Sequence, residues 1–376
     1  MKIAQNYNNK VYKFLALFFL ILSLGSCTNE YVEIKDTNIT QKEAKISLGE
    51  KLFFEKNLSN PGGQSCASCH SPETGFSDPQ HLTVSSGINP ELFGNRNAPS
   101  LAYGIFAPER FYNDIDETYI GGLFYDGRSK NLETQVLGPL LNPVEMNNTS
   151  TSMVVEKIKS LPFYSDFKAI YGETNDDNKL LSQLADAIST FEKSKKVNSF
   201  TSKFDYYSRQ LVPFTSDEKK GLDLFKGKAN CASCHILEPD ENTGKVLFTD
   251  FSYDNIGVPK NEKNPFYKMS SNINPQGINH IDYGIGSIVN QAAHNGKFKV
   301  PSLRNVAVSS PYFHNGFYTT LEEVIHFYNV RNIENQGIPE ISATVNTTEL
   351  GNLKLTPAEE KQLKLFLETL TDHYRK

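Results

Sequence analysis

Two copies of the pattern Cys-x-x-Cys-His are the residues of this chain whose types and spacing most directly imply chemistry. The copies are Cys66-Ala-Ser-Cys69-His70 and Cys231-Ala-Ser-Cys234-His235. Two thiols at this spacing can each form a thioether to a vinyl group of haem, and the adjoining histidine can bind the iron. A structural zinc site, the main alternative, would need a further pair of ligands at short spacing. The two motifs therefore predict two covalently attached c-type haems.

The one cysteine outside the two motifs, Cys27, follows a segment that is typical of the signal peptides of exported proteins. Three lysines near the N-terminus precede the apolar run Phe14–Leu24, which is too short to span a bilayer. The run ends in LGSC, which resembles the lipobox of bacterial lipoproteins, although an ordinary secretory signal with an incidental cysteine is an alternative. We expect a signal peptide over 1–26, lipidation at Cys27 and an anchor linker over 27–39. The mature chain would then face the periplasm or the cell exterior.

The composition excludes some partners. The formal net charge is −5, and loss of the three lysines in residues 1–26 makes it more negative. This balance argues against nucleic acid as a partner. It is compatible with a basic redox partner, for which charge mainly sets the rate of encounter.

A similar helical segment precedes each Cys-x-x-Cys-His motif, LGEKLFF over 48–54 and GLDLF over 221–225. Capping-box patterns predict the helix starts, Thr40 with Glu43 and Thr215 with Glu218. The length of the chain also favours two domains. We therefore expect a pseudo-repeat of two cytochrome c domains, residues 40–210 and 211–376.

The fold class is predicted to be mainly α. One apolar stripe has helical spacing and consists of Leu180, Leu184, Ile188 and Phe191. Another helix is expected after Thr356-Pro357, a capping pattern with proline in the first turn. The Asn-, Gly- and Pro-rich stretches 71–122 and 238–300 predict long loops that wrap the haems, with few strands.

Several further motifs occur in a fixed order along the chain. They are RNAPSL at 96–101, FYDGR at 124–128, ETQ at 133–135, NPVEM at 142–146, FTDFSYDNIGVP at 248–259, FKVPSLRN at 298–305, PYFHNG at 311–316 and TLEEVIHFYN at 320–329. With the two haem motifs, they make the chain resemble the bacterial di-haem cytochrome c peroxidase family, including its MauG-type branch, over roughly residues 40–372.

The resemblance implies a division of labour between the haems. The haem on His70 would react with peroxide, and the haem on His235 would have both axial positions filled and pass electrons. Family members use Met or Tyr after the PYFH-type motif as the second axial ligand, which points to Tyr328 here. His326 and Met269 are alternative ligands, and a packing aromatic is the alternative role for Tyr328.

The resemblance also implies residues on the distal side of the first haem. Glu145 in NPVEM would be the acid–base that moves a proton between the peroxide oxygens, although an isolated glutamate is more often a solvated charge. Gln135 would hydrogen-bond peroxide or water. His81 lies too early in the chain for the distal ligand that some peroxidases carry, so it is expected to be a loop residue that leaves the first iron open.

Tyr125 marks a departure from the family, which usually has Trp before Asp-Gly-Arg as a relay between the haems. The chain contains no Trp. Tyrosine can also be oxidised, but it loses a proton as it does so. Tyr125 is therefore expected to be a relay with a different pH dependence, or a packing aromatic.

The resemblance further implies a calcium ion held by Asn97 and by the carbonyls around Lys299 and Pro301. Oxygen ligands suit calcium. Three other residues are expected to orient propionates or loops, namely His314, Arg128 and Arg304.

The chain is thus predicted to be an enzyme, a cytochrome c peroxidase that reduces hydrogen peroxide with electrons from a small cytochrome c or similar donor. A MauG-type oxidant of a partner protein's side chains and a di-haem electron carrier without turnover are the alternatives. A homodimer is left open.

Overall fold

The computed structural model describes residues 29–375, with side chains from residue 40 onward. The predicted signal peptide and Cys27 lie outside the described residues. The chain divides into two units, 1–41 and 42–376, and the described residues of the first are the start of helix α1. Apart from the start of α1, over residues 29–41, all features below belong to the second unit. None of the helices within residues 29–375 has the length and apolarity of a membrane span.

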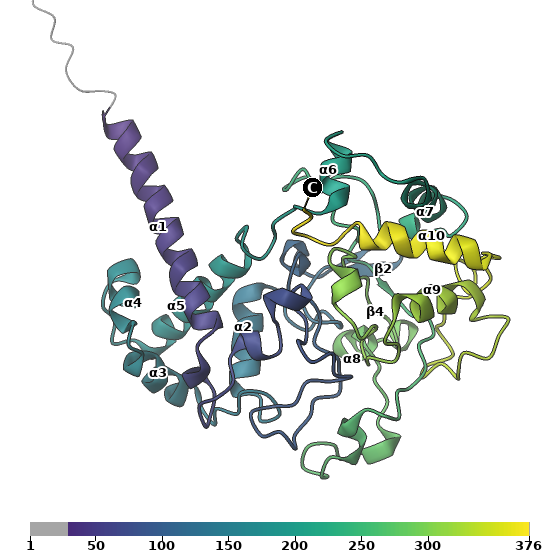
Figure 1. Cartoon of the computed structure of the whole chain (residues 1–376). Coiled ribbons are helices and arrows are strands. Elements are labelled where there is room, and N and C mark those ends of the chain that lie inside the picture. Colours follow the sequence, from purple (N-terminus) through teal and green to yellow (C-terminus); the bar gives the residue numbers. More distant parts are fainter. Residues whose placement is uncertain (1–28, 376) are drawn as a thin grey trace, which may run out of the picture. The chain divides into compact units, whose positions relative to one another are not determined.

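The described residues form ten α-helices, short 3₁₀ turns and four short strands (Figure 1). The α-helices are α1 Asn29–Phe53, α2 Leu132–Leu141, α3 Thr151–Ser160, α4 Tyr164–Tyr171, α5 Asp177–Glu192, α6 Lys203–Ser208, α7 Ser216–Lys226, α8 Ile285–Val289, α9 Leu321–Val330 and α10 Pro357–Glu368. The strands pair as two antiparallel ribbons, β1 Phe111–Asn113 with β2 Thr118–Ile120 and β3 Tyr253–Asp254 with β4 Phe298–Lys299. The mainly α class and the scarcity of strands are confirmed.

The helix starts test the capping patterns. Thr215 caps α7 and Thr356 caps α10, each in a reciprocal capping box. The prediction at Thr40 was wrong, because α1 begins at Asn29 and continues through it. Residues 29–39 contain neither Gly nor Pro, so the sequence holds no strong stop signal before Thr40.

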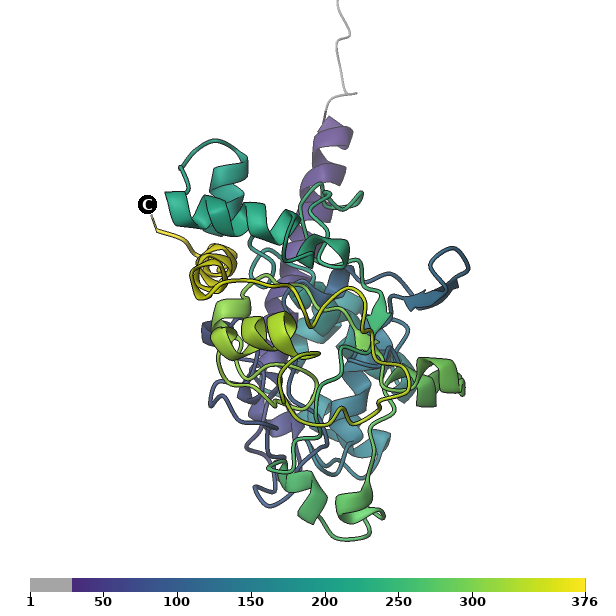
Figure 2. The same ribbon diagram turned by 90° about the vertical axis from the view of Figure 1, so that its right-hand side faces the viewer.

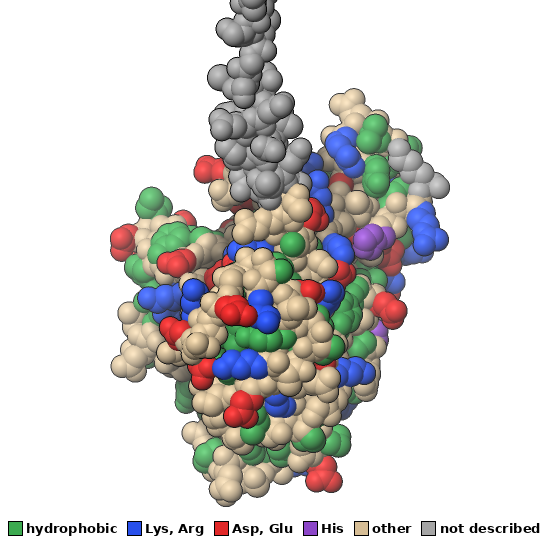
Figure 3. Space-filling view, turned by 90° about the vertical axis from the view of Figure 1, so that its left-hand side faces the viewer, with side chains coloured by type: hydrophobic (Ala, Val, Ile, Leu, Met, Phe, Trp, Pro, Cys, Tyr) green, Lys and Arg blue, Asp and Glu red, His purple; other side chains and the backbone are tan. Residues whose placement is uncertain are grey.

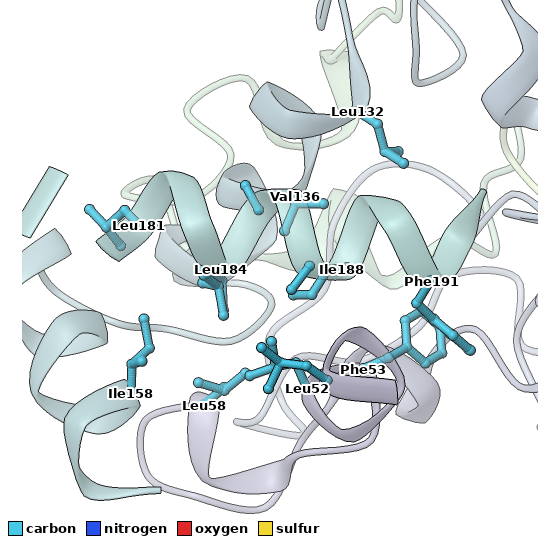
Figure 4. Packing of buried hydrophobic residues seen from close by; sticks show 14 of the residues in the cluster. Leu52, Phe53, Leu58, Leu132, Val136, Ile158, Leu181, Leu184, Ile188 and Phe191 are labelled. Carbon is cyan, nitrogen blue, oxygen red and sulfur yellow. The ribbon is translucent and has the colours of Figure 1, made fainter. Parts of the chain in front are cut away.

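A first hydrophobic cluster forms around α5 (Figure 4). Its predicted stripe is confirmed, since all four residues are buried. Leu52 and Phe53, from the last turn of α1, pack against this helix, and the Phe53 and Phe191 rings lie 5.2 Å apart. Burial of such side chains contributes about 1.5–3 kcal/mol each.

A second cluster forms where α7 and α10 cross, with α6 and α9 beside them. The Phe225 and Phe366 rings lie 5.1 Å apart. Phe204 of α6 also joins this cluster.

Glycine makes both helix crossings close. A Cβ on Gly49 of α1 would lie 2.0 Å from the carbonyl oxygen of Ala187 in α5. A Cβ on Gly221 of α7 would lie 2.0 Å from the carbonyl oxygen of Gln362 in α10. One turn further along each helix pair, the rings of Phe53 and Phe191, and those of Phe225 and Phe366, make the contacts described above. Only a residue without a side chain permits this approach.

Gly221→Ala is therefore expected to force α7 and α10 apart and to lower the free energy of unfolding by about 1–3 kcal/mol or more. Denaturant titration of the haem-loaded protein measures the change. Lys219→Ala, on an exposed position of the same helix, is the control and should stay within about 0.5 kcal/mol of wild type. Equal stability of Gly221→Ala and wild type would contradict the close crossing.

The expected long loops carry the connections between these helices. Segment 71–122 contains the β1–β2 hairpin, which projects from the body in Figure 2, and 238–300 contains α8 and the β3–β4 ribbon. Backbone bonds tie the two loops to each other, for example Gly121 N to Phe251 O at 2.9 Å. Figure 3 shows a face on which acidic and basic side chains are intermixed. Exposed ion pairs such as Lys159–Asp177 at 3.0 Å contribute about 0–1 kcal/mol.

Candidate active site

The two Cys-x-x-Cys-His motifs adopt the same local conformation. Each begins with a 3₁₀ turn, Cys66–Ser68 in the first and Cys231–Ser233 in the second. The amide of His70 donates to the carbonyl of Cys66, and that of His235 to the carbonyl of Cys231, both at 2.9 Å. The turn thereby holds each histidine beside its two thiols.

The hydrogen bonds of the two imidazoles assign their tautomers. Nδ1 of His70 lies 3.1 Å from the carbonyl oxygen of Phe76, and Nδ1 of His235 lies 2.9 Å from that of Phe248. A carbonyl oxygen can only accept, so Nδ1 carries the hydrogen and Nε2 keeps its lone pair. Burial lowers the pKa of both rings, for His235 to about 4. Each neutral ring can therefore give Nε2 to an iron, with the carbonyl fixing its orientation.

The four thiols are also neutral. Burial raises the pKa of Cys66 and Cys231 to about 12 and that of Cys69 and Cys234 to about 11. Addition of the sulfur and hydrogen of each thiol across a vinyl group would give a thioether. Within the described residues, no group of three or more His, Cys, Asp or Glu side chains could hold a metal ion.

One cavity of about 690 Å³ borders both motifs, with Cys69 and His70 from the first and Cys234 and His235 from the second. Its walls include many apolar side chains, among them Leu101, Ile105, Val306, Ile325 and Leu353. Apolar walls with a few convergent polar groups are typical of cofactor pockets. Thiols, imidazoles with a free Nε2 and apolar walls fit covalently attached haem.

Glu145 and Gln135 line this cavity together. Gln135 lies on α2, and Glu145 lies in the loop that follows the helix. Asn142, which ends α2, donates from Nδ2 to Oε1 of Glu145 at 2.7 Å and fixes the carboxyl group. Burial raises the pKa of Glu145, while Asn142 and Arg128 oppose the shift. A raised pKa makes a carboxyl group a stronger base, which favours its accepting a proton that it later returns.

Tyr125 lines the same cavity. Its carbonyl accepts from the amide of Lys299 at 2.8 Å, which joins the FYDGR loop to β4. Burial raises the pKa of its hydroxyl well above the usual value, and the charge of Arg96 opposes the shift. The phenol is therefore neutral in the wall of the cavity.

Tyr328, on α9, also lines the cavity. Burial raises the pKa of its hydroxyl, and the Cys234 and Cys231 thiols are near enough to add to the increase. The side chain therefore lies in the region of the second motif. His326 instead contacts Glu360 at 3.1 Å and Glu334 at 3.4 Å and is not among the lining residues.

His81 and Met269, the other two candidate iron ligands, lie outside the cavity. Nδ1 of His81 donates to the carbonyl of Ser310 at 2.9 Å, and the side chain is exposed. His81 is thus a loop residue in this structure, as expected.

Asn97, Lys299 and Pro301 all line the cavity. Asn97 is buried and donates from Nδ2 to the carbonyl of Pro311 at 2.6 Å, but its Oδ1 has no hydrogen-bond partner. A buried oxygen without a partner is costly unless an ion or water satisfies it. The ammonium group of Lys299 donates to the carbonyl of Gly122.

The remaining three candidates make different contacts. Arg304 is fully buried and forms a two-pronged pair with Asp205, both bonds being 2.9 Å. Arg304 does not line the cavity, so it holds α6 to the second cluster. Arg128 and His314 do line it, with Arg128 over the ring of Phe124 at 3.5 Å and His314 stacked on Phe298 at 3.6 Å.

The structure adds cavity residues that the sequence analysis missed. Glu192, at the end of α5, lines the cavity, and burial raises its pKa to about 8. Its position four residues after Ile188, on the apolar stripe, was the available signal. Arg96 bonds Asp282 at 2.6 Å and Asp126 at 2.6 Å, and nothing in the sequence paired Arg96 with Asp282.

Comparison with known proteins accounts for this arrangement. Residues 43–211 match the family model described as di-haem cytochrome c peroxidase. The methylamine utilization protein MauG of Paracoccus denitrificans (strain Pd 1222) is 35% identical over 352 residues, which cover 88% of this chain and 89% of MauG. The cytochrome-c peroxidase IdrP1 of Pseudomonas sp. (strain SCT) is 28% identical over 349 residues, covering 88% and 82% of the two chains.

Solved structures give the same result. The crystal structure of the diheme peroxidase BthA from Burkholderia thailandensis E264 superposes with a TM-score of 0.76 at 31% sequence identity, covering 88% of this chain and 86% of BthA. The two haem motifs, the shared cavity and these relatives agree, and the chain belongs to the di-haem cytochrome c peroxidase family.

Proposed function

We propose that this protein reduces hydrogen peroxide to water with electrons from a small c-type cytochrome or a similar donor. The observation that carries the proposal is the single cavity that borders both haem motifs and contains Glu145 with its raised pKa. The reaction consumes one peroxide, two electrons and two protons and gives two waters.

A haem bound at the first motif supplies the redox-active iron at which peroxide is reduced. His70 would hold that iron through Nε2 while its Nδ1 stays bonded to the carbonyl of Phe76. Glu145 would accept a proton from peroxide and return it to the oxygen that leaves as water. Gln135 orients the peroxide by donating a hydrogen bond. Asn142 keeps the Glu145 carboxyl group in position.

The second motif handles the electrons. His235 and Tyr328 are the residues that would hold the iron of the second haem. The proximity of Tyr328 to the thiols of Cys231 and Cys234 supports its role. Tyr125 is the proposed relay, supported by its place in the wall of the cavity and its bond to Lys299. Because its hydroxyl is protonated, oxidation of Tyr125 would require proton release.

We also propose the two-domain pseudo-repeat, with residues 40–210 and 211–376 as the halves. It is supported by the matching crossings at Gly49 and Gly221 and by the matching bonds of His70 and His235. The proposed location is periplasm-facing or at the cell surface, with lipidation at Cys27. That part rests on the sequence of residues 1–27.

A calcium ion at Asn97 and the carbonyls of Lys299 and Pro301 is proposed as well, supported by the unpartnered Oδ1 of Asn97. Asn97→Ala is expected to weaken calcium binding by at least about tenfold, since it removes the side-chain ligand. Calorimetric titration of the chelator-treated protein with calcium measures the affinity. Asn89→Ala, in the loop before it, is the control. Unchanged binding in Asn97→Ala would refute this site.

The deciding experiment is peroxide-dependent oxidation of reduced cytochrome c by the haem-loaded protein. It is run from the fully oxidised and the half-reduced state. Turnover from the oxidised state is expected, because His81 is bonded to Ser310. Turnover only after half-reduction would mean that another ligand blocks the first iron. Absence of turnover from either state with intact haems would refute the peroxidase function and favour the electron carrier.

A MauG-type oxidant of a partner protein is the second candidate, favoured by Tyr328 in the cavity and by the 35% identity to MauG. The two candidates differ in donor preference. An oxidant needs one specific partner protein, whereas a peroxidase accepts electrons from a small cytochrome in repeated cycles.

A further inference from the structure

The β1–β2 hairpin exposes large apolar side chains to solvent. Phe111 is 49% exposed, Tyr112 41% and Ile115 91%, the highest value among the large hydrophobic side chains of the described chain. Figure 2 shows the hairpin projecting from the body. Apolar side chains gathered on a projection favour a contact surface over a simple connection.

The hairpin is also held in one conformation. Tyr112 pairs with Tyr119 across the strands, and their rings lie 5.0 Å apart. Thr118 Oγ1 donates to the carbonyl of Tyr253 at 3.1 Å, and the amide of Gly121 donates to the carbonyl of Phe251 at 2.9 Å. Pre-organisation of this kind reduces the entropy lost on binding.

Every formal charge on the projection is negative. Asp114, Asp116 and Glu117 are exposed, and residues 111–127 contain no Lys or Arg. Arg110, just before β1, donates to the carbonyl of Gly127 at 2.8 Å. The hairpin thus differs from the face of Figure 3, where both signs are mixed.

The base of the hairpin is joined to the segment that follows the second haem motif. Ile120 forms a β-bridge with Ser252, and the amide of Gly121 donates to the carbonyl of Phe251 at 2.9 Å. The amide of Asp250 donates to the carbonyl of Cys234 at 3.0 Å. A protein docked on the hairpin would therefore lie beside the haem attached at Cys231 and Cys234.

We propose that the β1–β2 hairpin is the docking surface for a positively charged electron-donor protein of the small c-type cytochrome class. The inference rests on the proposed function. A basic cytochrome presents cationic side chains around an apolar haem edge, which complements apolar residues flanked by carboxylates. Each docked donor is oxidised by one electron, which passes to the haem on His235, and two such events supply one peroxide reduction.

Two variants test this surface, Ile115→Ser for the apolar contact and the double variant Asp114→Lys/Glu117→Lys for the charge. The matched controls are Ile338→Ser, whose side chain is 82% exposed elsewhere, and Glu156→Lys on α3. The probes are basic mitochondrial cytochrome c as donor protein and ABTS as a small donor that needs no docking surface. Haem absorption and thermal unfolding verify that each variant is folded.

Both hairpin variants are expected to raise the KM for reduced cytochrome c, and the Kd for oxidised cytochrome c by calorimetry, by roughly tenfold. The charge variant should also flatten the salt dependence of Kd. ABTS turnover and both controls should stay at wild-type values.

Hairpin variants that bind cytochrome c as tightly as the controls would overturn the docking surface while leaving the peroxidase function intact. Loss of self-association in Ile115→Ser, measured by sedimentation, with unchanged Kd would overturn it in favour of a second copy of the chain as occupant. Absence of ABTS turnover in wild type would instead refute the proposed function, and the calorimetric Kd would still test the surface.

Discussion

Glu145→Gln is expected to slow the reaction with peroxide by about 10²–10⁴-fold, the usual contribution of a positioned acid–base group. The substitution keeps the size of the side chain and an oxygen that can accept from Asn142, but it removes the group that carries the proton. Stopped-flow mixing of the oxidised protein with peroxide measures the rate constant. The absorption spectrum should change little, because both haem motifs are untouched.

The pH dependence provides an independent readout of the same residue. Glu145 must be ionised to accept the first proton, and burial raises its pKa. The rate constant should therefore fall as the pH falls, with an inflection above the pKa of an exposed glutamate, and Glu145→Gln should lose that inflection. Glu133→Gln is the control, since Glu133 lies on α2 but pairs with Lys193 at 3.0 Å. Wild-type kinetics in Glu145→Gln would assign the proton transfer to another group.

The sequence predicted the parts of the site that depend on local spacing. A Cys-x-x-Cys-His motif imposes its own turn, so both haem motifs follow from the pattern alone. The stripe on α5 and the caps at Thr215 and Thr356 are likewise local, and they were predicted correctly. The start of α1 was missed because a capping box is a preference, and a continuing helix can run through it.

Contacts between distant segments could not be predicted in this way. Arg96 bonds Asp282, which lies 186 residues later in the chain, and the fold alone brings them together. The burial of Glu192 depends on the distant segments that line the cavity with it. The shared cavity is also a tertiary property, since it collects side chains from residues 69 to 367. The role of Gly87 could not be predicted from the sequence either, because it depends on the peptide between Val144 and Glu145 that lies against this glycine.

Gly87→Ala is expected to slow the reaction with peroxide by up to about 10²-fold, although Gly87 is itself no acid or base. A Cβ at this position would lie 2.5 Å from the carbonyl oxygen of Val144 and 3.1 Å from the amide nitrogen of Glu145. The amide of Ile88 donates to the carbonyl of Glu145 at 2.8 Å, so this loop holds the backbone of the proposed acid–base residue. The added methyl group must displace that peptide, and a shift of about 1 Å at a reacting group can cost this much.

Gly94→Ala is the matched control for Gly87→Ala. It lies in the same loop and faces the same residue, but its Cβ would lie 4.0 Å from Cγ2 of Val144, which is an ordinary contact. Stopped-flow rate constants across pH should fall for Gly87→Ala at every pH where Glu145 is ionised and stay at the wild-type values for Gly94→Ala. Direct electron transfer from cytochrome c to the second haem, measured without peroxide, should be the same in both variants, because the loop is remote in sequence from Cys231 and His235. A loss of that transfer in Gly87→Ala would indicate general unfolding. Equal peroxide rates in the two variants would show that the loop does not position Glu145.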